Sequence, residues 1–326
     1  MPACCIMMIP DVYSKRTGRA ESMREPSAKY RYYHLPPEMG AFAFVGEGWG
    51  YGPAEPSERH FHNCVEIGIC RSGEVTEIGK ERGKVIQAGD VCVFPALCSH
   101  QLEAKKKRSD WQWIMADPEA VFWGTGSEFQ KIYERIELFR DGMVIRAADH
   151  PAVGKTAELL VKLFTEKAQQ RRMLKDLLIA FFCEYADLYQ KRTNMEGSYP
   201  KEESILWPAL ERIRRDYGAE LSVPQLAAEC HLSEPQFRRV FEQVTGFSPK
   251  RYINIVRIDR ACRNLAEQKG DIRGIAERCG FPTLSTFNRQ FQQQMQDTPR
   301  HWKEVCRRKN CISVTSLEEG NLYGIF

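Results

Sequence analysis

The chain has 326 residues, 43% of them hydrophobic, so it is long enough for two or three domains with buried cores. Its formal net charge of +4 is too small to indicate a partner by itself. The 12 cysteines form no CxxC pair, we find no export signal, and no run approaches the roughly 18 apolar residues of a membrane helix. We therefore expect a cytoplasmic protein with reduced cysteines and no membrane partner.

The first third of the chain is predicted to contain a β domain. Residues 1–28 mix Pro, Ser, Lys and Arg without periodicity, and we expect a disordered lead there. Between residues 29 and 116, short apolar runs alternate with turn signals, as in VEIGIC followed by RSGE and VTEIG. Short strands at such spacing are typical of an antiparallel β barrel or sandwich.

The middle of the chain, residues 117–192, is predicted to be helical. Apolar residues recur at helical spacing within 153–169 and 174–189. Each stripe has to be buried, either in the core of one subunit or against a second copy of the chain, and the sequence leaves both open. Residues 193–204 are polar, contain Gly and Pro, and are predicted to form a linker.

The last third contains an internal repeat. Residues 226–232 (LAAECHL) match residues 275–281 (IAERCGF) at an offset of 49. The pattern continues at an offset of 50, which pairs Phe237, Arg239, Phe241 and Pro249 with Phe287, Arg289, Phe291 and Pro299. A repeat of this length indicates one supersecondary unit built twice.

Each repeat has the pattern of a helix-turn-helix unit. A short helix is followed by a tight turn, where Gly280 of the second unit tolerates a left-handed conformation. In the first unit, Ser233 and Gln236 have the spacing of a capping box at the start of the next helix. That helix buries its phenylalanines and turns Arg, Asn and Gln outward, which are the side chains that read guanine and adenine edges in the major groove.

A further helix, predicted from Pro249 to about Lys269, would join the two units. A helix of about 19 residues spans about 28 Å, close to the roughly 34 Å between successive major grooves on one DNA face. Residues 205–308 contain 18 Lys and Arg against 12 Asp and Glu, while the remainder of the chain is slightly acidic. This basic region fits double-stranded DNA as a partner. The alternative is a helical protein-interaction domain with ordinary surface charges.

These residues resemble the DNA-binding domain of the AraC/XylS family of bacterial regulators. The matching stretches are LAAECHLSEPQFRRVFEQVTGFSPKRYI, RIDRACRNL and IAERCGFPTLSTFNRQFQQQMQDTPRHW. The resemblance implies contacts with bases or nearby phosphates from both second helices, through Gln236, Arg238, Arg239, Ser285, Asn288 and Arg289.

The second unit departs from the family pattern at two positions. Gln296 stands where the family usually has Gly, and Pro282 stands where the second recognition helix usually begins. We therefore expect the first unit to carry more of the sequence discrimination, and the second to add reach and affinity.

The β region resembles the cupin barrel, which many members of this family carry as an effector-binding domain. The first cupin motif, H-x-H-x3-E-x6-G, is met by His60, His62, Glu66 and Gly73. The second motif, G-x5-P-x4-H, is met by Gly89, Pro95 and His100. Three positions depart from the motifs, namely Ala54 and Leu97 in place of Gly and Ala104 in place of Asn.

The resemblance implies an effector-binding site made of His60, His62, Glu66 and His100. Alternation along a strand places residues 60 and 62 on one face, so convergence is physically sensible. Three interpretations stay open: hydrogen bonds to a sugar or another polar ligand, a site for Zn, Fe, Mn or Ni, and a structural or vestigial role. We consider two roles for Trp49, Trp111 and Trp113: stacking on the face of a sugar, or an ordinary place in the core.

The sequence therefore predicts an α+β multidomain fold with an N-terminal cupin-like β barrel, a helical middle segment and a C-terminal all-α double helix-turn-helix domain. The predicted boundaries are 1–28 for the lead, 29–116 for the barrel, 117–192 for a helical segment that is a candidate for dimerisation, 193–204 for the linker, 205–308 for the DNA-binding domain and 309–326 for the tail.

The predicted function is that of a sequence-specific transcription regulator controlled by a small molecule, with a sugar among the candidates. We expect RNA polymerase and a second copy of the chain as further partners, no cofactor and no enzymatic activity. One alternative is a metal-dependent cupin enzyme fused to a DNA-binding module. Another is an alkyl-transfer repair regulator, which would need a reactive cysteine in a repair domain, and the scattered cysteines form no such motif.

Overall fold

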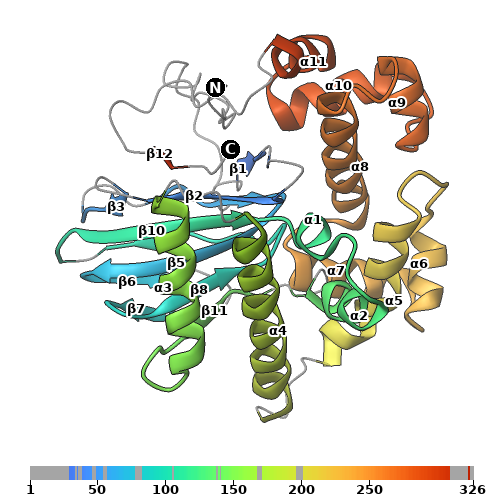
Figure 1. Ribbon diagram of the computed structural model, residues 1–326. Helices are drawn as coiled ribbons and strands as arrows, with labels where there is room; N and C mark the ends of the chain where they lie inside the picture. Colours follow the sequence, from blue (N-terminus) through green and yellow to red (C-terminus); the bar gives the residue numbers. More distant parts are fainter. Residues whose placement is uncertain are drawn as a thin grey trace. The chain divides into compact units, whose positions relative to one another are not determined.

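The computed structural model describes most of the chain (Figure 1). The described residues are 29–33, 35, 39–45, 49–53, 57–77, 83–104, 106–136, 139, 141–166, 171–195, 201–308 and 322–323. The predicted disordered lead and nearly all of the predicted tail lie outside them. The chain divides into two compact units, Met1–Tyr189 with Ile312–Phe326, and Gln190–Cys311.

The first unit is a β domain whose strands pair antiparallel apart from β1 and β4. The largest sheet runs β11-β8-β5-β10-β2-β12 with β3 added to β10, and a smaller sheet runs β7-β6-β9. The strands are β1 (Lys29–Arg31), β2 (Ala41–Phe44), β3 (Gly50–Tyr51), β4 (His60–His62), β5 (Val65–Ser72), β6 (Glu74–Glu77), β7 (Val85–Gln87), β8 (Val91–Phe94), β9 (Leu102–Glu103), β10 (Ser109–Ala116), β11 (Met143–Ile145) and β12 (Leu322–Tyr323).

Alternation along the strands gives the large sheet two different faces. Val65, Ile67 and Ile69 of β5 belong to one apolar core, while Cys70 of the same strand belongs to a second core on the other face. Glu66 lies between Val65 and Ile67 and therefore points into the second core. This placement puts a buried carboxylate inside the barrel.

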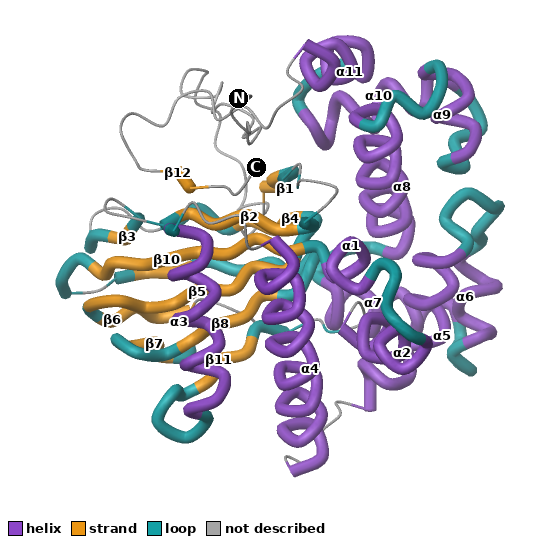
Figure 2. The backbone as a smooth tube through the Cα atoms, in the orientation of Figure 1, coloured by secondary structure: helices purple, strands orange, loops and turns teal. Residues whose placement is uncertain are grey.

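Helices cover the first face of the sheet, as Figures 1 and 2 show for α3 and α4. The apolar residues Leu160 and Phe164 of α3 and Phe181 of α4 share one core with Ile67 and Ile114 of the sheet. Full burial of such a side chain stabilises the fold by about 1.5–3 kcal/mol. Both predicted stripes are thus used within one subunit. The helices are α1 (Pro118–Phe122), α2 (Ser127–Ile136), α3 (Pro151–Thr165) and α4 (Arg171–Met195).

The second unit is all helical. Its helices are α5 (Lys201–Arg215), α6 (Val223–Glu229), α7 (Glu234–Thr245), α8 (Pro249–Ala266), α9 (Ile272–Arg278), α10 (Leu284–Met295) and α11 (Pro299–Arg308). The predicted linker, 193–204, overlaps the end of α4 and the start of α5, and residues 196–200 lie outside the described part. Among the described residues, no helix has both the length and the hydropathy to cross a bilayer.

The repeat read from the sequence is visible in the packing of the second unit. α6 and α7 form the first helix-turn-helix pair, α9 and α10 form the second, and α8 joins them (Figure 1). The same cluster of three aromatic rings occurs in each, with centroid separations of 5.3 and 5.4 Å in Phe237–Phe241–Tyr252 and 5.6 and 6.2 Å in Phe287–Phe291–Trp302.

Candidate functional site

The barrel brings together all four residues that the cupin motifs indicate. The candidate ligand atoms of His60, His62, Glu66 and His100 all lie within 4.8 Å of one another, and all four side chains are buried. His60 and His62 come from β4, and His100 reaches them because its backbone pairs with that of His60 through hydrogen bonds of 3.0 and 2.9 Å. We call these four residues the barrel cluster.

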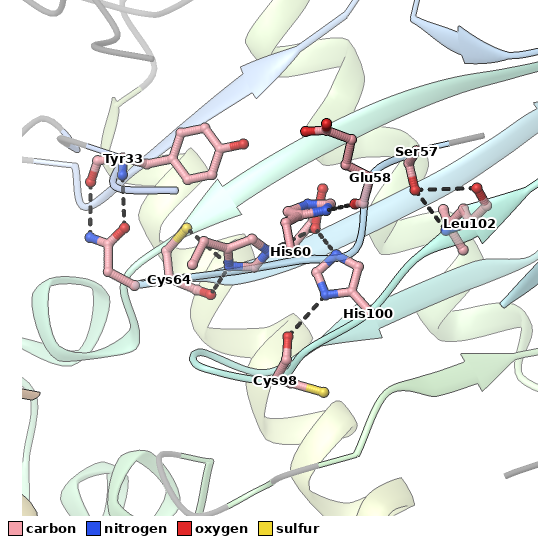
Figure 3. Close-up of polar contacts among 11 residues, drawn as sticks. Tyr33, Ser57, Glu58, His60, Cys64, Cys98, His100 and Leu102 are labelled. Carbon is pink, nitrogen blue, oxygen red and sulfur yellow. Dashed lines mark hydrogen bonds and ion pairs between the residues drawn. The ribbon is translucent and has the colours of Figure 1, made fainter. Parts of the chain in front are cut away.

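Each histidine of the barrel cluster is oriented by a main-chain carbonyl two residues away (Figure 3). Nδ1 of His60, His62 and His100 lies 2.8, 2.8 and 3.0 Å from the carbonyl oxygens of Glu58, Cys64 and Cys98, respectively. A carbonyl oxygen only accepts, so Nδ1 carries the proton and donates. In a neutral ring Nε2 then presents a lone pair, which is the orientation that metal-binding histidines need.

The centre of the barrel cluster can be satisfied in three ways: by a proton shared within the cluster, by a hydrogen-bond donor of a ligand, or by a metal ion. Burial lowers the pKa of His60 and of His62, which favours neutral rings. Burial alone raises the pKa of Glu66, but the neighbouring His62 and His100 outweigh it and hold that pKa well below its usual range. Glu66 Oε2 lies 2.8 Å from Nε2 of both His62 and His100. A carboxylate that close to lone pairs requires a shared proton, a ligand donor or a metal ion.

The aromatic residues around the barrel cluster are largely occupied with one another. Trp111 and Trp113 are buried and stack at 4.8 Å, and Trp111 Nε1 donates to Ser109 Oγ at 2.8 Å. Phe94 stacks on the ring of His100 at 4.0 Å. Of the three tryptophans considered for sugar stacking, Trp49 alone is half-buried, which leaves it the one with some surface free for a ligand.

Leu97 is the departure from the cupin motifs with a visible structural cost. It has a φ of 60°, in the left-handed region that the missing Gly would adopt without strain. Its N–H donates to the carbonyl oxygen of His62 at 2.8 Å, so the strained turn helps to hold the barrel cluster. Ala104 is buried, and Ala54 lies outside the described residues.

The reading helix of the first helix-turn-helix unit is α7. Arg238 and Arg239 are exposed on it, and Arg239 Nη1 donates to Gln243 at 3.3 Å. The predicted capping box is present, because the Ser233 N–H donates to Gln236 Oε1 at 3.2 Å. Gln236 therefore has a structural role in addition to its predicted contact with DNA.

The reading helix of the second unit is α10, which exposes Ser285, Asn288 and Arg289. Thr283 caps this helix by accepting from the N–H of Thr286 at 3.1 Å. Pro282 precedes the cap, so it does not disturb the start of the helix.

Two residues on these surfaces were not predicted from the sequence: Glu234 at the start of α7 and Leu284 at the start of α10. Their place in the first turn of each helix could be predicted from the repeat. The pairing of Glu234 with Arg238 and the exposure of Leu284 could not, since these depend on the packing of the turn. Together the fold and the two sites define a DNA-binding transcription regulator with a ligand-binding domain.

Comparison with known proteins agrees with this class. A family model described as an AraC-like ligand binding domain matches residues 42–182, and one described as a helix-turn-helix domain matches residues 226–304. The chain belongs to the AraC family of transcriptional regulators.

Individual relatives match over different lengths. The uncharacterized HTH-type transcriptional regulator YisR of Bacillus subtilis is 26% identical over 283 residues, which is 84% of this chain and 96% of that protein. An HTH-type transcriptional regulator of Mycobacterium tuberculosis is 32% identical over 88 residues, and this match covers 27% of the chain and only 34% of the relative. The crystal structure of ToxT from Vibrio cholerae aligns over 82% of this chain and 97% of its own, at 14% identity and a TM-score of 0.44.

Proposed function

We propose that this protein binds specific duplex DNA through α7 and α10 and changes that binding when an effector occupies the barrel cluster. The observation that carries the proposal is the pairing of two features. One is a repeated helix-turn-helix unit with exposed polar reading faces, and the other is a buried set of four polar groups whose candidate ligand atoms converge within 4.8 Å.

The reading faces support the DNA part of this function. Arg238 and Arg239 on α7, with Asn288 and Arg289 on α10, are exposed side chains of the types that recognise guanine and adenine. The 18-residue α8 spans about 27 Å, which is close to the spacing of successive major grooves.

The test of the DNA part is selection of binding sites from a random duplex library with the full-length protein. We expect a two-part site with its halves about one helical turn apart, and binding that weakens steeply with salt. Recovery of sequences with no shared element would contradict the proposal.

We propose that the effector is a small polar molecule that donates hydrogen bonds to Glu66 and to the Nε2 atoms of the histidines. A sugar has the hydroxyl donors for this role. The test adds a panel of monosaccharides to the DNA-binding assay. We expect one of them to change affinity for the selected site in the wild-type protein and not in His62→Ala.

A metal ion at the barrel cluster is a second candidate, favoured by the three Nδ1 contacts that turn Nε2 inward. Three imidazole nitrogens and one carboxylate suit Zn, Fe, Mn or Ni. Such an ion would be held by the four residues of the barrel cluster, where it would neutralise Glu66 and offer a Lewis-acidic position to an effector.

Metal analysis of the protein purified without chelators, together with titration of Zn²⁺, Mn²⁺, Ni²⁺ and, under anaerobic conditions, Fe²⁺, separates the two candidates. His62→Ala should lose metal affinity by about 100-fold or more, while His150→Ala should not, because His150 lies outside the barrel cluster. A protein that binds none of these ions would reject the second candidate.

We propose further that the protein is not an enzyme, that it contacts RNA polymerase, and that it forms a homodimer. The names of its relatives as transcriptional regulators support the first two points. A groove of about 760 Å³ beside α3, with Lys155, Glu158, Lys162 and Glu166 along it, supports the third, because alternating charges suit an antiparallel copy of the same helix. Sedimentation analysis of Lys155→Glu/Lys162→Glu against wild type tests it.

A further inference from the structure

The two reading helices share their main buried positions, Phe237 with Phe287 and Phe241 with Phe291, but differ in chemistry on the exposed side. At an offset of 50, both expose an arginine, Arg239 and Arg289. The first turns differ, because Glu234 corresponds to Leu284 and Arg238 corresponds to Asn288. The N-terminal residues of a recognition helix are the ones that meet base edges, so this difference falls where sequence is read.

Leu284 is an apolar side chain in a place that water reaches. It is 36% exposed and follows the cap residue Thr283 directly. Among the described residues of 201–308, no other large hydrophobic side chain is as exposed. An apolar side chain at this point in the major groove contacts the C5-methyl group of thymine, which no other DNA base carries. Asn288, one turn further on, has the two-pronged geometry that reads adenine.

Glu234 and Arg238 form a pair at the equivalent place on α7. Glu234 Oε1 accepts from Nη2 of Arg238 at 2.6 Å and from its Nε at 2.9 Å. Both side chains are more than a third exposed, so the pair contributes little stability and keeps its other polar atoms free. Arginine reads guanine through O6 and N7, and a carboxylate accepts from N4 of cytosine.

We propose that the two reading helices select opposite base pairs at equivalent positions, with Glu234 and Arg238 of α7 selecting G·C and Leu284 and Asn288 of α10 selecting A·T. This inference rests on the proposed DNA-binding function and adds the base composition of each half-site. Arg239 and Arg289, which are shared, do not distinguish the units.

Replacement of thymine by deoxyuridine tests the contact of Leu284, because it removes only the C5-methyl group. In the half-site read by α10, we expect the wild-type protein to lose about fourfold in affinity for the uracil duplex, the loss of one buried methyl contact. Leu284→Ala should lose a similar factor on the thymine duplex and show no further loss with uracil. An equal uracil effect in wild type and Leu284→Ala would overturn the assignment, as would no effect in wild type.

An exchange variant tests both helices by gain of a preference. Leu284→Glu/Asn288→Arg copies the first unit onto α10, and site selection should then return G·C in place of A·T in that half-site, with at least about tenfold discrimination. Gln292→Glu/Gln293→Arg is the matched control, because it adds the same two charges at exposed positions further along α10 and should leave base preference unchanged. An unchanged half-site in the exchange variant overturns the inference.

The outcomes separate this inference from the function on which it rests. Specific binding to a site whose halves do not differ in base composition overturns the inference and leaves the proposed function intact. Absence of specific duplex binding by the full-length wild-type protein overturns the proposed function itself.

Discussion

Gly246 and Gln296 occupy equivalent positions at the ends of the two reading helices, and both have left-handed backbone conformations, with φ of 76° and 53°. Glycine adopts this conformation freely, whereas a residue with a Cβ atom is strained in it by about 1–2 kcal/mol. The departure from the family pattern at Gln296 is therefore a strained C-cap rather than a different fold of the turn.

Replacing Gln296 by Gly should stabilise the second helix-turn-helix unit by about 0.5–1 kcal/mol. The relief of backbone strain exceeds the extra chain entropy of Gly in the unfolded state. Urea unfolding of the full-length protein measures it. The reverse change, Gly246→Gln, should destabilise the first helix-turn-helix unit through backbone strain. A Cβ at Gly246 meets no neighbour within 4 Å, so no steric clash adds to this strain. Equal stability of all three proteins would show that the caps are not under strain.

Gly68 of β5 makes room for Trp113. A Cβ at this position would lie 2.2 Å from Cζ3 of Trp113 and 2.7 Å from Sγ of Cys92. Gly68→Ala should therefore destabilise the β domain by about 1–3 kcal/mol through overpacking. Thermal unfolding followed by tryptophan fluorescence measures this, with Gly89→Ala as a comparison at a glycine that has space around it but a positive φ. A Gly68→Ala protein as stable as wild type would contradict the packing of Trp113.

Much of this architecture could be predicted from the sequence where spacing alone decides the outcome. The barrel cluster was readable because strand alternation places His60 and His62 on one face, and the cupin motifs supply Glu66 and His100. The exposed reading faces followed from helical periodicity and the repeat. Which of the two ways the helical stripes are buried was not readable, because a stripe records that a partner exists and not which partner it is.

Local hydrogen bonds and long-range contacts could not be predicted from the sequence. The Nδ1 contacts of the barrel histidines depend on how the backbone folds back at Cys64 and Cys98. Pairing of Arg238 with Glu234 was available as a spacing of four residues, but its geometry was not. Nothing in the sequence pointed to the contacts of Arg257, which join segments about 40 residues apart.

Arg257 of the connecting helix α8 holds the segment that precedes the first helix-turn-helix unit through hydrogen bonds. It donates to the carbonyl oxygens of Tyr217 and Ala219 at 2.8 and 2.9 Å. Its guanidinium lies 5.9 Å from the ring centroid of Phe281 in the second helix-turn-helix unit. Arg257→Ala should cost about 1–2 kcal/mol of stability and lower DNA affinity without contacting DNA. Arg257→Lys should recover part of the stability. Unfolding and DNA-binding titrations check both, and an unaffected Arg257→Ala protein would refute the role.

Arg239 is expected to contribute directly to DNA recognition. Arg239→Ala should weaken specific binding by about 1–3 kcal/mol and make the dependence on salt less steep. The control is Arg215→Ala on α5, which removes an exposed arginine that is paired with Asp216 and belongs to neither reading helix. Anisotropy titrations at several salt concentrations measure both. The same loss in the two variants would mean that general charge, not reading of the site, accounts for the effect.

The most direct test of the account is the affinity of the full-length protein for its selected duplex in excess competitor DNA, measured with and without the effector or metal identified for the barrel cluster. We predict a preference of at least about 1,000-fold over competitor, and a shift in affinity on addition of the ligand that is absent in His62→Ala. Affinities for selected and competitor duplexes within about tenfold of each other, with or without ligand, would contradict it.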